Sequence, residues 1–477
     1  MKLLLCLYSL CFCFVSCKQA IDNQKQDNTN PKPNVLIICI DDLRPELKSF
    51  GASYILSPNI DSLAQQGISF KKHYVNAPSC GPSRYTLLTG QYGSASNDAL
   101  FRRAQKISKF STVNPSMPEW FKSNGYKTVS VGKISHHPGG RGRENWNDST
   151  IIEIPNAWDR HLMPVGSWKH PRGTMHGLAN GEIRNEANEM DIFQSAAGNE
   201  VTYPDDLITD EAINQIKDLT LNNNQPFFLA VGIIKPHLPF GAPKSYYDLY
   251  QNVVLPSISN PYKPEGKTTW HNSSEFKKYN RWGKDPNVDA AFADEVRRHY
   301  AACVTYADAK VGKILNQFKK TGADKNTIVL LWGDHGWHLG EHAIWGKHSL
   351  FEESLHSPLI IYDPTTKHEK KEINEIVETL DIFPTLCELT GIEIPEYVDG
   401  KSLMSALNAS DFIPRVAVAY TPKAQTIRNE SYRLIVHNDG FVELYDHSKD
   451  EKETENIANQ HPTVVKDLTE ILKSKLH

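Results

Sequence analysis

The sequence predicts an α/β protein with a large domain and a small C-terminal subdomain. Four apolar strand patterns occur along a chain that also carries clear helical periodicity, which is typical of a mostly parallel central sheet flanked by helices. Beyond residue 398 the pattern changes to short strands and a final helix, which indicates a small antiparallel sheet with a closing helix. The 477 residues, 39% hydrophobic and 23% charged, are enough for both parts.

The first 33 residues are expected to form an export signal followed by a linker. Met1 and Lys2 precede an apolar run at 3–15, a signal peptide too short to span a membrane as a mature helix. Small residues before Cys17 resemble a bacterial lipobox, so we expect a lipoprotein-type signal at 1–17 and lipidation of Cys17, with simple periplasmic secretion as the alternative. The polar residues 18–33 predict a flexible linker. The protein is thus expected to be lipid-anchored in the cell envelope, in the periplasm or at the outer-membrane surface.

The net charge and the cysteine content exclude two classes of protein. A formal net charge of −4 gives no overall attraction to nucleic acid, so an anionic substrate must be captured by a local cationic site. The body of the chain keeps four cysteines, too few for a disulfide framework in a domain of this size. They are Cys39, Cys80, Cys303 and Cys387.

A continuous apolar strand at 34–40 opens the predicted sheet and ends in Asp41 and Asp42. Adjacent carboxylates repel each other unless a cation lies between them. Their oxygens suit Ca²⁺ or Mg²⁺ better than zinc. We therefore expect a hard cation at this strand end, with a solvated acidic turn as the alternative.

The segment 80–90 predicts a tight turn that leads into a short helix. Pro82 suits the first helical turn, and Gly90 falls where the helix would end. Because a helix N-terminus presents unpaired N–H groups, an anion beside Cys80 would be stabilised. Arg84 could add a cationic fork to the same place. The segment alone is equally compatible with a cysteine in an ordinary loop.

Two further apolar strands, at 128–131 and 226–232, are each followed by a lysine and a histidine. The two pairs are Lys133 with His136, and Lys235 with His237. Such pairs can bind an oxyanion and exchange a proton. Residues 242–295 show little periodicity and indicate a long excursion over one face of the domain. Its aromatic residues would either line a sugar site or serve in packing; they are Trp270, His271 and Trp282.

A fourth apolar strand at 327–332 follows an amphipathic helix predicted at 295–320. This strand ends in Asp334 and His335, a second pair of metal ligands. Lys347 is a further candidate cation for the same site. From residue 416 onward we expect four short strands and a helix near 461–475. The predicted domains are therefore 34–398, which is catalytic, and 399–477.

The chemistry-bearing residues all follow predicted strand ends. Because the carboxyl ends of neighbouring parallel strands meet at one edge of a sheet, residues about 300 positions apart are expected to form one site. Three carboxylates around a cation, several cationic groups and two imidazoles suit an ester of a strong oxyacid. Hydride transfer and acyl transfer fit poorly, since the chain has no G-x-G-x-x-G, P-loop or G-x-S-x-G motif.

The C-x-P-x-R motif at 80–84, with its Leu-Thr-Gly continuation, resembles the signature of formylglycine-dependent (type I) sulfatases of the alkaline-phosphatase superfamily. Gly-Lys-x-x-His at 132–136 and the segment 336–347 are similar to the iduronate-2-sulfatase branch and its bacterial relatives. The similarity covers most of the large domain and is weakest in three stretches. These are 145–205, 242–295 and the C-terminal part.

The resemblance implies an alkaline-phosphatase-like fold and a set of roles. A separate formylglycine-generating or sulfatase-maturing enzyme would oxidise Cys80 to formylglycine, an aldehyde whose hydrate is the nucleophile. The implied Ca²⁺ ligands are Asp41, Asp42, Asp334, His335 and the modified Cys80. The implied sulfate-binding and proton-transfer groups are Lys133, His136, His237, Lys347 and Arg84. His237 would protonate the leaving sugar oxygen and His136 would accept a proton from the hydrate, an assignment that could be reversed. Lys235 and Trp337 are further candidate substrate contacts.

The function expected from this resemblance is hydrolysis of sulfate esters on a sulfated polysaccharide or its oligosaccharides. The favoured group is a uronic-acid 2-O-sulfate or a similar sugar sulfate, as in a glycosaminoglycan or an ulvan-type algal glycan. The alternatives are a formylglycine-dependent phosphodiesterase or phosphonate hydrolase, and a non-catalytic surface lipoprotein that binds glycans. No nucleic acid is expected as a partner, and membrane attachment is expected only through Cys17.

Overall fold

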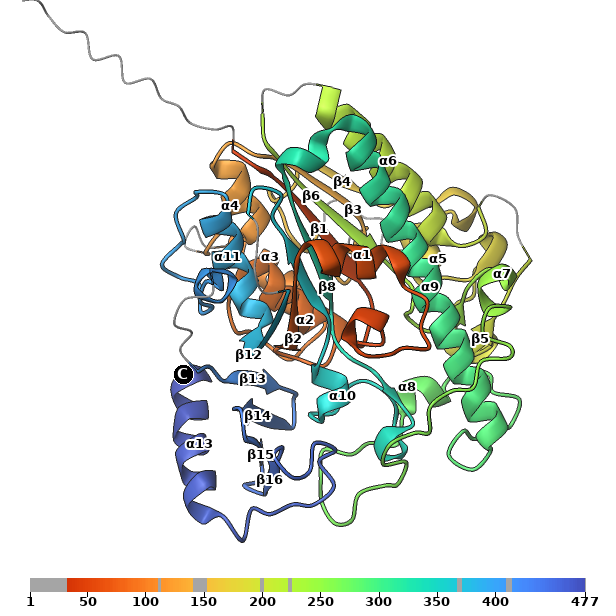
Figure 1. Ribbon diagram of the computed structural model, residues 1–477, viewed down its shortest axis with the longest axis vertical. Coiled ribbons are helices and arrows are strands. Elements are labelled where there is room, and N and C mark those ends of the chain that lie inside the picture. The colour runs from red at the N-terminus through yellow and green to blue at the C-terminus, as the bar shows by residue number, and fades with distance from the viewer. Residues whose placement is uncertain are drawn as a thin grey trace, which may run out of the picture. The chain divides into compact units, whose positions relative to one another are not determined.

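A mixed eight-stranded sheet lies at the centre of the protein, with the strand order β12-β2-β11-β8-β1-β6-β3-β4 (Figure 1). β11 runs antiparallel to its neighbours β8 and β2, while the other pairings between the described strands of this sheet are parallel. The strands are β1 (Asn34–Ile40), β2 (Ile68–Tyr74), β3 (Lys127–Gly132), β4 (Arg160–Leu162), β6 (Phe227–Ile233), β8 (Thr327–Gly333), β11 (Leu359–Tyr362) and β12 (Glu372–Glu378).

The structure is a computed structural model that describes residues 32–109, 113–139, 152–197, 201–221, 225–366, 371–408 and 414–476. The predicted signal peptide, Cys17 and most of the predicted linker lie outside these residues. From Pro33 onward the described chain forms one compact unit. Within the described ranges, no helix combines the length and the apolar character needed to cross a lipid bilayer.

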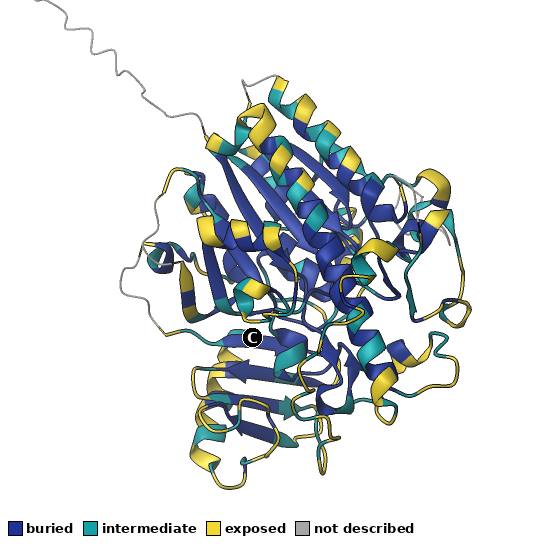
Figure 2. Ribbon diagram, turned by 45° about the vertical axis from the view of Figure 1, so that its right-hand side comes forward, coloured by how far each residue is buried: buried dark blue, intermediate teal, exposed yellow. Residues whose placement is uncertain are grey.

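Alternating side chains of β1 explain why the sheet is covered on both faces. Leu36, Ile38 and Ile40 belong to one hydrophobic core, and Val35, Ile37 and Cys39 belong to the other. The first core includes α1 (Pro58–Gln66), α6 (Pro204–Leu221) and α9 (Ala290–Thr321). The second includes α2 (Cys80–Thr89), α4 (Met117–Ser123) and α11 (Ile382–Leu389). The continuous apolar strand runs therefore predicted a sheet between two helical layers correctly (Figure 2).

The strand register brings several strand ends to the same level. β1 pairs Ile40 with Ile233 of β6 and with Gly333 of β8, and β3 pairs Gly132 with Gly232. The residues that follow these pairs therefore leave the sheet at one edge, as expected for parallel strands.

The C-terminal part forms the predicted antiparallel sheet and closing helix (Figure 1). The elements are β13 (Ala417–Tyr420), β14 (Ala424–Arg428), β15 (Tyr432–His437), β16 (Val442–Asp446) and α13 (Pro462–Leu476). One face of this sheet packs on Leu468 and Leu472 of α13. The other face packs on Leu350, Phe351 and Leu355 of the large domain, so the small sheet is held between its own helix and the catalytic part.

Shorter elements connect these layers. The helices are α3 (Ala99–Ile107), α5 (Pro171–Met175), α7 (Lys244–Tyr247), α8 (Ser274–Lys277), α10 (Glu352–Leu355) and α12 (Met404–Leu407). The strands are β5 (Phe193–Gln194), β7 (Phe240–Gly241), β9 (His338–Leu339) and β10 (Trp345–Gly346). β9 and β10 form a small antiparallel hairpin after β8. The helix expected at 295–320 starts earlier, at Ala290, because the Asp289 side chain caps it by accepting a hydrogen bond from Phe292 N.

Candidate active site

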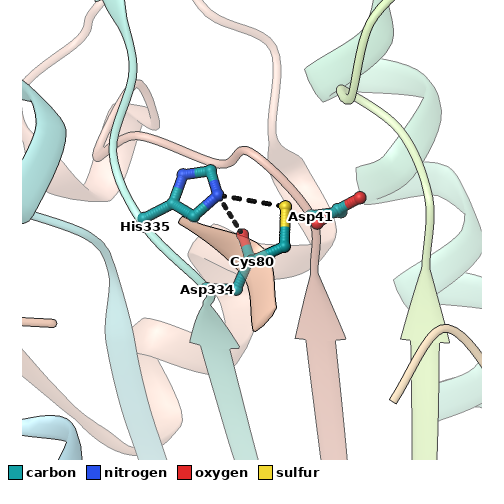
Figure 3. A group of neighbouring side chains, drawn as sticks. All are labelled: Asp41, Cys80, Asp334 and His335. Atoms are coloured by element: carbon teal, nitrogen blue, oxygen red, sulfur yellow. Dashed lines mark hydrogen bonds and ion pairs between the residues drawn. The ribbon is translucent and has the colours of Figure 1, made fainter. Parts of the chain in front are cut away.

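The ends of β1 and β8 place three carboxylates and one imidazole beside the start of α2. Asp41 and Asp42 follow β1, and Asp334 and His335 follow β8. Cys80 is the first residue of α2, and Figure 3 shows its sulfur directed toward the His335 ring. These side chains, from three separate parts of the chain, are fully buried or nearly so. The predicted convergence of strand ends is thus present in the fold.

The motif around Cys80 folds into a helix start held against the sheet. Gly81 is required because a Cβ there would lie 2.4 Å from Asn97 Cα, and its N–H donates to Asn97 Oδ1 at 3.1 Å. The Ser83 hydroxyl donates to the Asp334 carbonyl oxygen. Gly90 adopts φ 66° and ends the helix, as its sequence position predicted. The small residues of the motif therefore allow α2 to pack closely on the end of β8.

The Cys80 sulfur, which stands where formylglycine would stand, has three polar neighbours. It lies 3.2 Å from Lys347 Nζ, 3.4 Å from His335 Nε2 and 3.9 Å from Asp42 Oδ1. Burial, together with the negative charge of Asp41, raises the pKa of the thiol well above its usual value. An unmodified thiol at this position is therefore mostly protonated and weakly nucleophilic.

The carboxylates show how the site tolerates so much negative charge. The Asp42 N–H donates to Asp334 Oδ1 at 2.8 Å. Against the effect of burial, Lys133 holds the pKa of Asp41 well below its usual range, and its ammonium donates to Asp41 Oδ2. Burial and the Asp41 charge raise the pKa of Asp334 well above its usual range. A bound cation would relieve the repulsion that remains between these carboxylates.

The donor set fits a hard divalent cation. One ligand atom each from Asp41, Cys80, Asp334 and His335 lies within 4.8 Å of the others. Asp42 Oδ2 is buried and has no hydrogen-bond partner among the residues that the structure describes. Three carboxylates match the oxygen preference of Ca²⁺, while His335 contributes the one nitrogen donor. The unpaired Asp42 oxygen is the structural observation that favours an ion here.

Arg84 is directed at the carboxylates rather than at open space. Its Nε donates to Asp334 Oδ2 at 3.1 Å and its Nη2 to Asp41 Oδ1 at 3.0 Å. Its Nη1 donates to the backbone oxygens of Lys133 and Ile134. The guanidinium is fully buried. This arrangement differs from the expected sulfate contact, because the donors of Arg84 are already used to hold Asp41 and Asp334.

Lys347 is the ammonium group that contacts residue 80. It donates to Asp42 Oδ1 at 2.8 Å and lies 5.5 Å above the ring centre of Trp337. Although burial acts in the opposite direction, Asp42 raises the pKa of Lys347 well above its usual value, so the ammonium stays charged. The hairpin of β9 and β10 carries Lys347 to this place, immediately after Gly346.

The two expected proton-transfer histidines occupy different surroundings. His237 has a ligand atom within 4.8 Å of those of Asp41, Asp42 and Cys80, and its Nδ1 donates to the Leu238 carbonyl oxygen at 2.6 Å. That hydrogen bond leaves Nε2 as the unprotonated nitrogen of the neutral ring. His136 has a buried Nδ1 with no hydrogen-bond partner among the described residues. Burial lowers the pKa of both imidazoles, so both are neutral near pH 7.

Lys235 and Trp337, the two further candidate contacts, are both fully buried. The Lys235 ammonium donates to the backbone oxygens of His237 and Pro239, and Trp337 packs edge-on against Phe240. Their surroundings indicate support of the His237 loop and of Lys347 rather than contact with a sugar.

A cleft of about 680 Å³ lies beside the site and is lined by both the large domain and the small sheet. Its lining includes Pro82 and Lys347, and also Trp270 and His271. Trp282 is half exposed and packs on Phe193 instead. No motif in the C-terminal strands indicated that they would face the site, since their contribution depends on how the two sheets are placed. The residues that this subdomain contributes to the cleft are Tyr420, Thr421, Pro422, Lys423, Ala424, His437, Asn438 and Asp439.

The comparisons with known proteins agree with this geometry. The sulfatase family model matches residues 33–392, and a model described as N-sulphoglucosamine sulphohydrolase, C-terminal, matches 340–477. The chain belongs to the sulfatase family. It is therefore a sulfuric ester hydrolase with the sulfatase fold.

The sulfatase has similar relatives in bacteria and in animals. It is 30% identical over 481 residues to a sulfatase from Formosa agariphila, covering 94% of this chain and 87% of the relative. It is 31% identical over 412 residues to iduronate 2-sulfatase from Homo sapiens, covering 79% of this chain and 72% of the relative. A solved structure of BT4656 in complex with its substrate D-glucosamine-2-N,6-O-disulfate shares the fold, with a TM-score of 0.69 at 21% identity. That match covers 93% of this chain and 97% of the other.

Proposed function

We propose that this sulfatase hydrolyses sulfate esters of sulfated oligosaccharides, with formylglycine at position 80 and Ca²⁺ in the carboxylate cluster. The observation that carries the proposal is the meeting of Cys80, Lys347 and Asp42 at the start of α2. Residue 80 is buried between the charged ammonium of Lys347 and the carboxylate of Asp42, one oxygen of which has no partner among the described residues. The ammonium is suited to bind an anionic ester, and the carboxylate is suited to bind a cation.

Asp41, Asp42, Asp334, His335 and residue 80 would hold the metal. When bound, Ca²⁺ supplies a Lewis acid that offsets negative charge on sulfate oxygens. Formylglycine supplies a hydrated aldehyde as the nucleophile. Both groups require the buried carboxylates to keep their positions. Arg84 holds Asp41 and Asp334 in place by forming an ion pair with each of them.

The remaining residues of the site bind the sulfate and move protons. Lys133 and Lys347 reach the carboxylates from two different strand ends and would neutralise charge on the sulfate oxygens. His237, whose Nε2 is free to take up a proton, would accept the proton that the attacking hydroxyl of residue 80 gives up and pass it to the leaving sugar oxygen. His136, whose Nδ1 has no hydrogen-bond partner among the described residues, would accept a proton from residue 80.

The proposed substrate is a 2-O-sulfated uronic acid or a similar sugar sulfate. Two similarities support a sugar: the relative named iduronate 2-sulfatase, and the structure bound to D-glucosamine-2-N,6-O-disulfate. The cleft beside the site carries Trp270, a ring suited to a sugar face, and Lys423, a cation suited to sulfate or carboxylate groups. Lys267 also lines the cleft, but its ammonium pairs with Asp439. Glycosaminoglycan and ulvan-type fragments both offer such groups.

A sulfate-release screen tests this proposal. Matured enzyme would be incubated with defined glycosaminoglycan and ulvan oligosaccharides that differ in the position of one sulfate, and free sulfate would be measured. We expect release from uronic-acid 2-O-sulfate units. Preferred hydrolysis of an aryl phosphodiester or a phosphonate ester over every sulfated substrate would instead support the phosphonate-hydrolase alternative. Binding without any release, by protein shown to carry formylglycine, would support a glycan-binding role.

We also propose how the enzyme reaches its place of action. The leader at 1–17 would direct export and Cys17 would carry a lipid, which keeps the enzyme in the cell envelope near its polysaccharide. A maturing enzyme would convert Cys80 before folding buries it, because the side chain is almost inaccessible in the folded protein. Labelling with radioactive palmitate, compared between the full chain and Cys17→Ala, tests the anchor.

A further inference from the structure

A second group of metal-binding side chains lies outside the sulfate site. It consists of His338 in β9, His342 in the 3-10 turn η6 (Glu341–Ala343) and Glu353 in α10. One ligand atom from each residue lies within 4.8 Å of the other two. Glu353 Oε2 is 3.8 Å from His338 Nδ1 and 3.7 Å from His342 Nδ1. Both imidazoles are completely buried.

Two atoms in this cluster face each other without a hydrogen-bond partner in the described part of the chain. They are His342 Nδ1 and Glu353 Oε2. A buried polar atom without a hydrogen-bond partner lowers the stability of the folded protein by about 1–3 kcal/mol. A water molecule or an ion therefore normally contacts such an atom. Their separation of 3.7 Å is too long for a direct hydrogen bond. It is close to the spacing of roughly 3.3 Å between two ligands of one tetrahedral zinc ion.

The outer nitrogen of each imidazole has a partner that can accept a hydrogen bond, the arrangement that metal-binding histidines require. His338 Nε2 lies 2.9 Å from Ser349 Oγ, and His342 Nε2 lies 3.4 Å from the Glu453 carbonyl oxygen. If both Nε2 atoms donate, both Nδ1 lone pairs point into the cluster. His338 Nδ1 also lies 3.2 Å from the Glu341 carbonyl oxygen, a contact that the metal-binding tautomer would give up. The Phe351 ring stacks on the His342 ring at 4.0 Å and fixes its plane.

The charges around the cluster favour a cation. Glu341 and Glu453 both act on Glu353, and together with burial they raise its pKa well above the usual range. Arg44 pairs with Glu341 and Arg433 pairs with Glu453, so both arginines are already engaged with other carboxylates. A divalent ion between the two imidazoles would allow Glu353 to be ionised.

We propose that His338, His342 and Glu353 bind a structural Zn²⁺ ion. Two imidazole nitrogens and one carboxylate oxygen are zinc ligands, whereas a nitrogen-rich set is a poor site for Ca²⁺. A water molecule would complete the tetrahedron. The ion would tie β9 to α10 and so brace the hairpin that precedes Lys347. The site is independent of the proposed sugar specificity, because none of its ligands lines the substrate cleft.

The metal content of the full chain tests this proposal. The protein would be incubated with zinc chloride in calcium-containing buffer, separated from free metal by gel filtration, and analysed by inductively coupled plasma mass spectrometry. We expect about one zinc per chain, and at least a tenfold loss of bound zinc in His342→Asn and in Glu353→Gln. A wild-type chain that remains free of zinc, or variants that keep it, would overturn the proposal.

Two control variants assign the ion to a position. Cys80→Ala removes the thiol near His335, a second place where zinc could bind, and should keep its zinc. His447→Gln alters a third cluster, Glu352, His447 and Glu453, in which Arg433 already pairs with both carboxylates. It should keep its zinc as well. Loss of the ion in Cys80→Ala alone would place it in the sulfate site and contradict the assignment.

Cobalt substitution tests the site in the wild-type protein, so its result does not depend on whether the cluster variants fold. Wild-type protein loaded with Co²⁺ is expected to show visible d–d bands of a four-coordinate nitrogen and oxygen site, without a thiolate-to-metal charge-transfer band. Zinc is also expected to raise the melting temperature when calcium is kept in excess. A thiolate band, or an unchanged melting temperature together with no cobalt spectrum, would count against the site.

Discussion

Among the cations of the site, Lys347 is the one that we expect to matter most for the reaction, because it contacts residue 80 directly. Its ammonium contacts both Asp42 and Cys80 and is buried at the end of the β9–β10 hairpin. A charge held in a dry site acts strongly on a developing anion and needs no reorganisation during the reaction.

Replacing Lys347 by alanine is expected to lower kcat by about 10²–10³-fold, as for removal of one preorganised donor. Initial rates on an aryl sulfate measure this effect. The control is Lys244→Ala, which removes an exposed lysine paired with Asp248 at the surface. Because both partners of that pair are largely exposed, its loss should change neither stability nor rate measurably. Equal rates for wild type and Lys347→Ala would exclude a role in charge stabilisation.

His237 and His136 can be told apart by the leaving group of the substrate. If His237 supplies the proton to the leaving oxygen, His237→Ala should lower the rate by about 10²–10⁴-fold with an alkyl or sugar sulfate, and much less with a nitrophenyl sulfate, whose leaving group needs no proton. His136→Ala should lower the rate on both substrates to a similar extent. If His136→Ala instead shows the dependence on the leaving group, His136 supplies the proton to the leaving oxygen and His237 accepts the proton from residue 80.

At the residue scale, the sequence predicted that the residues at the strand ends and Cys80 lie together. It did not predict which hydrogen bonds and ion pairs these side chains form. The strand-end positions of Asp41, Asp42, Asp334 and His335 followed from the apolar runs before them. The use of the Arg84 donors could not be predicted, because a guanidinium near an anion site can face either the ligand or the protein carboxylates. That choice depends on the separation of Asp41 and Asp334, which only the register of β1 and β8 sets.

At the element scale, β12 joins the catalytic domain to the small sheet through one carboxylate. Glu378 Oε1, at the end of β12, accepts hydrogen bonds from Val418 N at 2.8 Å and from Asn76 Nδ2 at 2.9 Å. Burial and the neighbouring Asp381 raise the pKa of Glu378 to about 7. The junction between the two parts therefore carries a group that titrates near neutral pH.

The raised pKa of Glu378 predicts that the free energy of unfolding depends on pH. Since the pKa of Glu378 is higher in the folded chain than its ordinary value of 4.5, the folded state binds the proton more tightly than the unfolded state. Its contribution to stability is complete below pH 4.5 and is lost as the pH rises through about 7. Glu378→Gln, which keeps an oxygen acceptor without a charge, should remove this part of the pH dependence.

Denaturant unfolding of wild type and Glu378→Gln across this pH range measures the difference. Glu388→Gln, at an exposed position of α11, is the matched control and should follow the wild-type curve. Parallel curves for wild type and Glu378→Gln would show that Glu378 does not titrate in this window.

The elements that the sequence predicted are those with long apolar runs. β1, β3, β6 and β8 were expected within one residue or so of their observed ends, because each is buried on both faces. β11 has only four residues, and β12 mixes the exposed Glu372 and Asn374 with buried isoleucines. An apolar run of four residues is too short to assign to a strand from its pattern, and β12 lacks a clear alternation; both become strands by pairing with β2.

At the scale of the whole molecule, the cleft proposed to bind the substrate is lined by residues of both the large domain and the small sheet. Lys423, in the turn between β13 and β14, lines the cleft together with Trp270 and His271 of the large domain. We expect a small aryl sulfate to occupy only the part of the cleft next to Lys347, and an oligosaccharide to extend toward Lys423.

Lys423→Ala is therefore expected to raise KM for a sulfated oligosaccharide by roughly 2- to 5-fold, as for an exposed charge contact of up to about 1 kcal/mol, and to leave kcat/KM for an aryl sulfate unchanged. Steady-state kinetics on both substrates measure the split. Lys449→Ala, in the same subdomain but outside the cleft lining, should behave as wild type. If Lys423→Ala leaves the KM for oligosaccharides unchanged, the small sheet does not contribute to substrate recognition through this residue.

The central claim is that residue 80, as formylglycine, is the nucleophile of a calcium-dependent sulfatase. Sulfate release by Cys80→Ser, compared with wild type after coexpression with a maturing enzyme, tests it most directly. The serine variant should keep the fold, as judged by circular dichroism, and lose multiple-turnover sulfate release almost completely, because a single hydroxyl cannot form the hydrate. Sustained turnover by Cys80→Ser at a rate near that of wild type would contradict the claim.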